Sequence, residues 1–139
     1  MTRSFVDTNV LVYSVDANEP VKRPVARRVL AEDPAALVLS TQVLGEFYVT
    51  VTRKLRVPMT AAAAAAAVTA LGRLRVVATD LSLVHAAMAT AQAAQLSYWD
   101  ALIIEAAASA GCDRVLTEDL NAGATIRGVT IVNPFDQRA

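Results

Sequence analysis

The sequence has few of the residues that define disulfide-rich, zinc-binding or membrane proteins. Cys112 is its single cysteine and His85 its single histidine, so it offers no disulfide framework and no thiolate zinc site, and we interpret His85 as structural. No uninterrupted apolar run reaches the roughly 18–20 residues that a membrane span needs. The first residues lead directly into a strand-like segment without a signal-peptide pattern. We therefore expect a cytoplasmic protein that does not enter a membrane.

An excess of either charge is also absent, because 13 Lys and Arg residues are balanced by 13 Asp and Glu residues. Domains that hold nucleic acid by electrostatics alone usually have a basic excess, so net charge gives no support for such binding. Glycine and proline are scarce, whereas 55% of the residues are hydrophobic, which excludes a disordered chain. The apolar excess also indicates that a partner covers part of the surface.

Short apolar segments alternate with helical patterns along the whole chain. The segments that we expect to be strands are Ser4–Val6, Leu37–Leu39, Leu74–Ala78, Arg114–Thr117 and Val129–Val132. The expected helices cover Thr8–Ser14, Glu19–Glu32, 41–54, 61–71, 81–95 and 98–109, and Leu120–Ile126 is expected to be a turn or a short helix. This alternation predicts an α/β fold with a parallel sheet of four to five strands and helices on both faces. No linker or repeat divides residues 1–139, which we expect to form one domain.

Capping residues define most of the helix boundaries. Ser40 or Thr41, Thr60, Asp80 and Ser97 are the expected N-caps. Gly72 and Gly111 are expected to end the helices that precede them. The seven alanines at 61–67 give a helix of high propensity with a side that packs closely, and we assign them no chemical role.

Four acids converge on one edge of this predicted sheet. They follow two strands or lie in the first turns of two helices: Asp7, Glu46, Asp100 and Asp119. Ligands of open parallel sheets bind outside the carboxyl ends of the strands, and all four acids are within reach of that edge.

Each acid also has a structural explanation. Asp100 lies three residues after Ser97 and fits a capping box, and Asp7 could cap a turn or a helix. Glu46 could be a solvated helix residue, although it borders an apolar face. Asp119 could cap the segment after it, and Glu118 competes with it as the functional acid.

Clustered carboxylates repel one another unless a cation lies among them. Two such charges about 4 Å apart cost about 4 kcal/mol at an effective dielectric constant near 20. Oxygen ligands without His or Cys select Mg²⁺ or Mn²⁺ over zinc. One or two such ions could activate water and stabilise charge on phosphate during phosphodiester hydrolysis, which would allow a neutral protein to cleave nucleic acid.

Four motifs follow one another along the chain: FVDTNVLVY at 5–13, STQVLGEFY at 40–48, SYWDALI at 97–103 and LTEDL at 116–120. With VNPF near the end, the chain resembles PIN-domain ribonucleases, and among them the VapC toxins of toxin–antitoxin pairs. The resemblance spans nearly the whole chain and implies a PIN-like α/β/α sandwich.

The resemblance implies Mg²⁺- or Mn²⁺-dependent endonucleolytic cleavage of RNA, which stops translation when the toxin is free. It assigns the catalytic and metal-binding roles to Asp7, Glu46, Asp100 and Asp119. It also implies a homodimer and a neutralising VapB-type antitoxin.

Further residues are candidates around these acids. Asn9 and Thr117 match supporting polar positions in the family, whereas Glu118 occupies a position that varies. Arg53, Lys54 and Arg56 form the densest basic cluster, which could contact the RNA backbone or simply end a helix with favourable charge. Trp99, together with Tyr98, could stack on a base or pack in the core or an interface.

Two other functions fit parts of the pattern. A receiver-type phosphoacceptor domain would need a lysine at a strand end, but Lys22 and Lys54 both fall in predicted helices. A non-catalytic α/β interaction module would use the acids as helix caps and surface charges. Metal titration separates that module from a nuclease.

Overall fold

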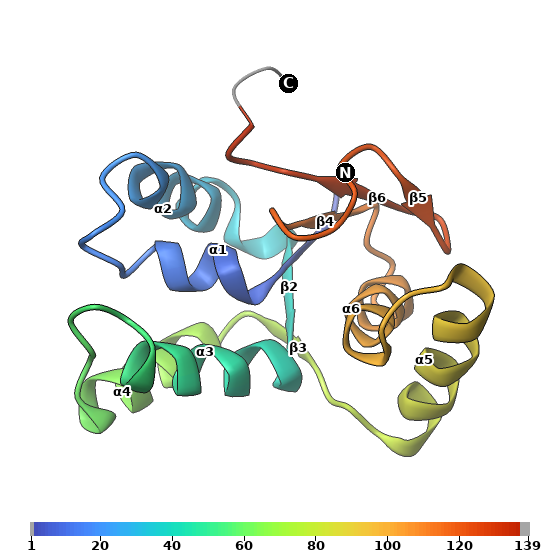
Figure 1. The fold of residues 1–139 in the computed structure, drawn as a ribbon, viewed down its shortest axis with the longest axis horizontal. Coiled ribbons are helices and arrows are strands. Elements are labelled where there is room, and N and C mark those ends of the chain that lie inside the picture. The colour runs from blue at the N-terminus through green and yellow to red at the C-terminus, as the bar shows by residue number, and fades with distance from the viewer. Residues whose placement is uncertain (1, 137–139) are drawn as a thin grey trace.

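The computed structural model describes residues 2–136, and its strands form one twisted sheet (Figure 1). The strands are β1 (Ser4–Val6), β2 (Leu37–Ser40), β3 (Arg75–Val77), β4 (Arg114–Leu116), β5 (Thr125–Ile126) and β6 (Val129–Val132). Their order across the sheet is β3-β2-β1-β4-β6-β5. All neighbouring pairs are parallel except β5 and β6, which are antiparallel.

Helices cover both faces of the sheet. They are α1 (Thr8–Tyr13), α2 (Lys22–Glu32), α3 (Thr41–Arg53), α4 (Ala61–Leu71), α5 (Leu81–Ala94) and α6 (Tyr98–Ser109). Figure 1 shows α1 to α4 on one side of the sheet and α5 and α6 on the other. The predicted α/β sandwich is therefore confirmed. No helix within residues 2–136 is long and apolar enough to cross a membrane.

The number of strands differs from the prediction of four to five, because β5 forms where Leu120–Ile126 was expected to be a turn or a helix. Arg127 and Gly128 both have a positive φ, of 54° and 77°. Two such residues in succession are typical of the tight turn that folds one strand back on the next. The pair Arg-Gly lacks the Asn-Gly signature of this turn, so the sequence did not reveal the hairpin.

The predicted helix caps are confirmed. The side chains of Ser40, Thr60, Asp80 and Ser97 each accept a hydrogen bond from the backbone N–H three residues further on. At the open choice between Ser40 and Thr41, Ser40 is the cap. Helix α2 begins at Lys22 rather than Glu19, which leaves Pro24 in the first turn, where its missing N–H costs nothing.

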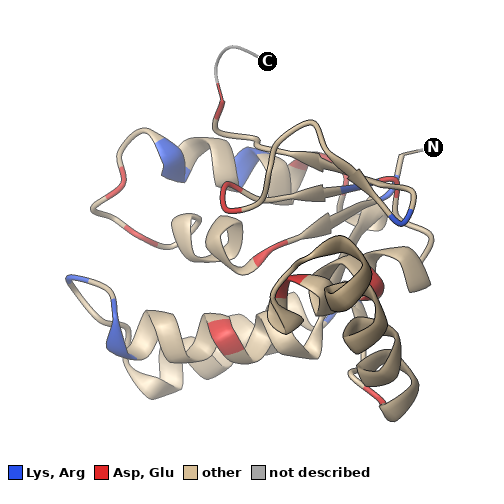
Figure 2. Cartoon of the chain, turned by 45° about the vertical axis from the view of Figure 1, so that its right-hand side comes forward, with Lys and Arg blue, Asp and Glu red and all other residues tan. Residues whose placement is uncertain are grey.

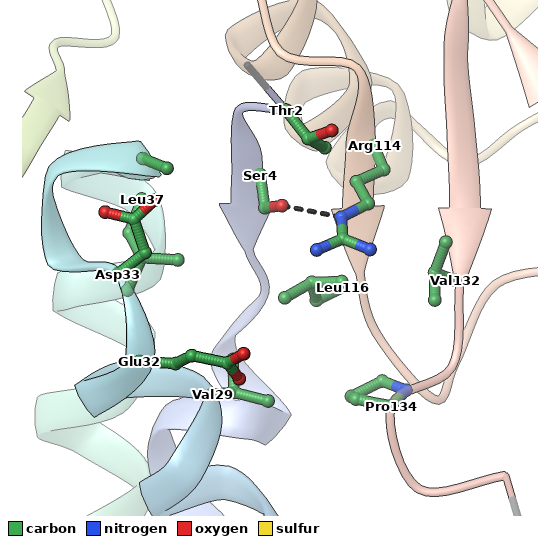
Figure 3. Close-up of a pocket in the computed structure, with 11 residues that line it drawn as sticks. Thr2, Ser4, Val29, Glu32, Asp33, Leu37, Arg114, Leu116, Val132 and Pro134 are labelled. Atoms are coloured by element: carbon green, nitrogen blue, oxygen red, sulfur yellow. Dashed lines mark hydrogen bonds between the residues drawn. The ribbon is translucent and has the colours of Figure 1, made fainter.

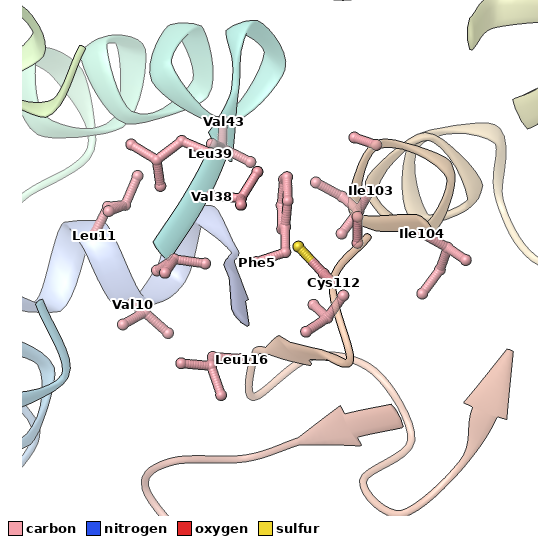
Figure 4. Packing of buried hydrophobic residues seen from close by; sticks show 14 of the residues in the cluster. Phe5, Val10, Leu11, Val38, Leu39, Val43, Ile103, Ile104, Cys112 and Leu116 are labelled. Carbon is pink, nitrogen blue, oxygen red and sulfur yellow. The ribbon is translucent and has the colours of Figure 1, made fainter. Parts of the chain in front are cut away.

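Apolar side chains from both layers fill the space on either side of the sheet (Figure 4). Val10 and Leu11 lie on the α1 side, whereas Ile103 and Ile104 of α6 lie on the other. Phe5, in the central strand β1, is fully buried. Burial of each large apolar side chain stabilises the fold by roughly 1.5–3 kcal/mol, so this core fixes how the strands align.

Strand register brings the ends of β1 and β4 together. Val6 pairs with Leu116, and the N–H of Asp7 donates to the carbonyl oxygen of Leu116 over 3.0 Å. Asp7 and Thr117 therefore leave the sheet side by side at its carboxyl edge. Ser40 ends β2 at the same edge and begins α3, which carries Glu46.

Candidate active site

The four predicted acids line one pocket, which we call the acid pocket. They come from four elements: Asp7 after β1, Glu46 from the second turn of α3, Asp100 from the first turn of α6 and Asp119 after β4. The pocket has a volume of about 560 Å³. It lies at the carboxyl edge of the sheet, where the sequence predicted a site.

A chain of hydrogen bonds joins two of the acids to the predicted supporting residues. Thr117 Oγ1 donates to Asp7 Oδ2 over 2.8 Å. Asn9 Nδ2 donates to Thr117 Oγ1 and to Asp119 Oδ2, over 3.1 and 3.0 Å. The Asp119 N–H also donates to Thr117 Oγ1. Thr117, which is fully buried, thus holds Asp7 and Asp119 in a fixed relation.

The Asp7 carboxylate has anionic neighbours and no ion-pair partner among residues 2–136. Burial raises its pKa from 3.8 to about 6. Hydrogen bonds from Thr117 and the Thr8 N–H lower this pKa, whereas the charges of Asp119 and Glu46 raise it further. Asp7 also caps α1 through the Thr8 N–H, so the capping role expected for it is present as well.

The two helix-borne acids are held more loosely. Glu46 is exposed, and its Oε1 accepts a hydrogen bond from Thr8 Oγ1 over 2.8 Å. Asp100 uses its backbone N–H to complete the Ser97 cap, over 3.1 Å. Within residues 2–136 the Asp100 side chain has no hydrogen-bond partner, so the capping box is one-sided and this carboxylate is free in the pocket.

Glu118 does not line the acid pocket. Its carboxylate accepts a hydrogen bond from Tyr13 Oη and forms a salt bridge of 2.9 Å with Lys22 Nζ. The Lys22 ammonium also lies 4.8 Å from the centre of the Tyr13 ring, and Phe135 packs edge-on against that ring. The hydrogen bond to Glu118 raises the pKa of Lys22. Glu118 and Asp119 are adjacent in sequence, but Asp119 lines the acid pocket, whereas Glu118 pairs with Lys22 and Tyr13 outside it.

The candidate RNA contacts separate in the structure. Lys54, the C-cap of α3, and Trp99, in the first turn of α6, both line the acid pocket, whereas Arg53 and Arg56 do not. Figure 2 shows the basic end of α3 beyond the acidic position in the middle of that helix. Trp99 is 62% exposed, so it is not a core residue.

Helix α3 contributes more of the pocket than the sequence analysis recognised. Gln42, Gly45, Val49 and Thr50 line it together with Glu46. Their spacing of three and four residues places them on one face of the helix. This periodicity, counted from Glu46, was the signal that could have identified them.

A second hollow lies between α2 and the sheet (Figure 3). Its charged side chains are of both signs, and Arg114 Nε donates to Ser4 Oγ over 2.7 Å. Its acids are Glu32 and Asp33, which are neighbours in sequence, whereas the acid pocket is lined by four acids from four separate elements. The acid pocket is therefore the candidate active site.

The largely parallel sheet, with four carboxylates lining a pocket at its carboxyl edge, makes this chain an α/β protein with an acidic pocket. The PIN domain model matches residues 4–125, and the chain belongs to the PIN-domain family.

Solved structures agree with this assignment. VapC20 of Mycobacterium tuberculosis, a toxin that cleaves the sarcin–ricin loop, is 26% identical, with a TM-score of 0.66 over 84% of this chain and 91% of that one. A toxin–antitoxin complex from Klebsiella pneumoniae shares the fold at 21% identity and a TM-score of 0.69, over 94% of this chain and 97% of that one. DNA-bound VapBC from Salmonella typhimurium does so at 22% identity and a TM-score of 0.67, with the same coverage. No curated protein sequence is similar enough to count as a match.

Proposed function

We propose that this chain is a metal-dependent endoribonuclease toxin of the VapC type, with residues 1–139 acting as one nuclease domain. The observation that carries the proposal is that Asp7, Glu46, Asp100 and Asp119, from four separate elements, line one pocket. The PIN-domain match and the similarity to a toxin that cleaves RNA support it. Cellular RNA is the proposed substrate, and its cleavage would inhibit translation and growth in the cytoplasm.

The donor set suits Mg²⁺ or Mn²⁺, because all four side chains offer carboxylate oxygens and no His or Cys lines the pocket. Among the described residues, no three His, Cys, Asp or Glu side chains already stand close enough together to hold an ion. Glu46 and Asp100 therefore have to turn toward Asp7 and Asp119, and their looser attachment permits this. Burial, together with the charges of Asp119 and Glu46, raises the pKa of Asp7, and no cation of residues 2–136 offsets this.

One or two divalent ions held by these acids would supply an activated water and neutralise charge on the phosphate. The chain's own residues have separate tasks. Thr117 and Asn9 fix the oxygens of Asp7 and Asp119. Thr8 donates a hydrogen bond to Glu46, and Lys54 places one positive charge at the pocket for a phosphate of the RNA.

A homodimer and a neutralising VapB-type antitoxin are the proposed protein partners. Exposed apolar side chains support partner contacts, among them Tyr48 and Val49 on α3, which border a shallow apolar hollow together with Val68 of α4. The toxin–antitoxin complexes of similar fold support the same proposal.

The alternative is a non-catalytic interaction module in which the acids serve as caps. The cap that Asp7 provides to α1 favours it. Capping does not explain why the Asp100 side chain lacks a partner within residues 2–136 and lies in a pocket shared with three other acids.

Replacement of Asp100 by Asn tests the proposal against this alternative. We expect Asp100→Asn to slow Mn²⁺-dependent cleavage of total cellular RNA by roughly 100-fold or more, because a charge on the metal site is lost. Thermal stability is expected to stay unchanged, since the Ser97 cap uses the backbone of residue 100.

Asp80→Asn is the matched control, because Asp80 begins a helix as a cap and lies outside the acid pocket. This variant should cleave at the normal rate. Equal cleavage by Asp100→Asn and the unmodified protein would remove Asp100 from the catalytic set. No cleavage and no Mn²⁺ or Mg²⁺ binding by the unmodified protein would leave the interaction module as the function.

A further inference from the structure

A further hollow, distinct from the one between α2 and the sheet, adjoins the acid pocket on the α6 side. We call it the Trp99 pocket; Tyr98, Trp99 and Leu102 of α6 face Gln42 and Gly45 of α3 across it. Its volume of about 540 Å³ falls within the range of small-ligand sites. Gln42, Gly45, Glu46 and Trp99 line both hollows, so a ligand can extend from one into the other.

The exposed tryptophan is the main feature of this pocket. Trp99 is 62% exposed, and Tyr98 meets its ring edge-on, with centroids 4.9 Å apart at 78°. The contact with Tyr98 holds the indole in place without covering it. An exposed aromatic ring beside a nucleic-acid site provides a surface on which a base stacks.

Gln42 offers hydrogen-bonding capacity beside the indole. Its Nε2 donates to the Trp99 carbonyl oxygen over 3.3 Å, whereas its Oε1 is buried without a partner within residues 2–136. A buried acceptor without a donor is costly, and a small turn of the amide would present it to the pocket that it lines. A base edge carries donors that would satisfy it.

The charge of the two hollows differs in a way that identifies the ligand group. The Trp99 pocket contains no Lys or Arg among its described lining residues, and its one charged lining residue is Glu46, so it does not suit a phosphate. The acid pocket has Lys54 on its wall and the proposed metal ligands within it. A phosphate in the acid pocket and a base in the Trp99 pocket match one nucleotide unit.

We propose that the Trp99 pocket binds one unstacked base of a single-stranded RNA segment, next to the phosphate held among the four acids. The base stacks on Trp99, and the Gln42 amide bonds to its edge. Paired RNA keeps its bases stacked within the helix, so this subsite selects loops and single strands. The inference rests on the proposed ribonuclease function and adds a base-binding subsite to it.

Trp99 is the only tryptophan of the chain, so its fluorescence reports directly on stacking. We would titrate the Asp100→Asn protein, in which the RNA should stay intact, with single-stranded oligoadenylate and oligouridylate hexamers and with the duplex of the two. We expect the single strands to quench Trp99 emission in a saturable manner and the duplex to leave it unchanged. Equal quenching by the duplex, or none by either strand, would overturn the subsite.

Gly45 allows the pocket to be filled without disturbing the core, because a Cβ at this position meets nothing within 4 Å. Gly45→Phe should weaken hexamer binding roughly tenfold or more, which corresponds to the loss of one stacked base. Ala66→Phe is the matched control, since it adds the same ring at an exposed position on α4 that lines neither hollow. Gln42→Leu should raise KM for single-stranded RNA severalfold with little change in kcat.

The outcomes distinguish the subsite from the ribonuclease itself. Unchanged hexamer binding by Gly45→Phe, with metal-dependent cleavage intact, would remove the subsite and leave the ribonuclease in place. If Gly45→Phe converted a dimer to a monomer but left binding per protomer unchanged, a second copy would occupy this face and the proposal would be wrong. Quenching by single strands with no cleavage under any metal would keep the subsite and overturn the ribonuclease.

Discussion

The carboxylates of Asp7 and Glu105 are both shielded from solvent, but the charged groups around them have opposite signs. Glu105, on α6, is only 4% exposed. It accepts hydrogen bonds from Thr90 Oγ1 and Arg127 Nε, each over 3.0 Å, and from Arg127 Nη2 over 3.3 Å. Within residues 2–136 the Asp7 carboxylate accepts hydrogen bonds only from Thr117 and Thr8, and its charged neighbours are other acids.

The difference separates an acid that the protein neutralises from one that has no cation of the described residues beside it. Arg127 supplies the charge that Glu105 needs, so this pair links the β5–β6 turn to α6 and serves the structure. Burial raises the pKa of Asp7 because no such partner is present among the described residues. A carboxylate such as that of Asp7, which has no cation of the protein beside it and shares its pocket with three other acids, is what a cation-binding site requires.

Removal of Arg127 is the largest test of this comparison. Arg127→Ala should lower Tm by roughly 5–10 °C, because the buried Glu105 carboxylate loses its cation. Differential scanning calorimetry measures the change. RNA cleavage at 25 °C should stay normal, since neither residue lines the acid pocket.

The double variant Glu105→Gln with Arg127→Ala is the control. It should be more stable than Arg127→Ala alone, because a neutral amide does not need the cation. If the double variant were no more stable, the loss would come from the turn backbone at Arg127, which has a φ of 54°, and not from the unpaired carboxylate.

The sequence predicted the Asp7 region far better than the Glu105 region. Asp7 follows a buried strand, and parallel strands bring their ends to one edge, so topology alone placed this acid in the pocket. Glu105 stands among alanines and isoleucines of α6, and its partner lies 22 residues further along in an unpredicted hairpin. Pairings of this kind depend on tertiary contacts that local patterns do not encode.

The same limit applies within the acid pocket. Four acids, Lys54 and Trp99 were named from the sequence and line the pocket. Gln42 and Gly45 were missed, although helical spacing from Glu46 indicated their face. The separation of Glu118 from Asp119 was not predictable, because it depends on Lys22 and Tyr13, which are distant in sequence.

The pH dependence of stability tests the isolation of Asp7 more finely. Its folded pKa of about 6 lies above the ordinary value of 3.8, so the folded state holds the proton more tightly than the unfolded chain does. The free energy of unfolding of the metal-free protein should therefore fall as pH rises from about 4 to about 6, by about 1–2 kcal/mol from this group. Urea titrations of the unmodified protein and Asp7→Asn, at pH 4.5 and 7.5 in EDTA, measure it.

Asp7→Asn should lack this part of the pH dependence, because an amide does not titrate. The difference in stability between the two proteins should then shift in favour of the variant between pH 4.5 and 7.5. A constant difference across this range would mean that the Asp7 carboxylate already has a compensating partner, and the contrast with Glu105 would be lost.

Lys22→Met gives the smallest expected effect and decides to which kind of acid Glu118 belongs. Glu118 adjoins Asp119 in sequence but, like Glu105, is paired with a cation of the protein. If that pair only fastens the loop that carries Asp119, its loss should weaken Mn²⁺ affinity about threefold by calorimetry, because one surface-accessible pair contributes little.

Arg28→Met is the control, since it removes a positive charge from the exposed side of the same helix without a contact to Glu118. It should leave the Mn²⁺ affinity unchanged. Tighter Mn²⁺ binding by Lys22→Met would mean that the released Glu118 carboxylate joins the acid pocket. Glu118 would then be a metal ligand that its salt bridge with Lys22 keeps out of the acid pocket.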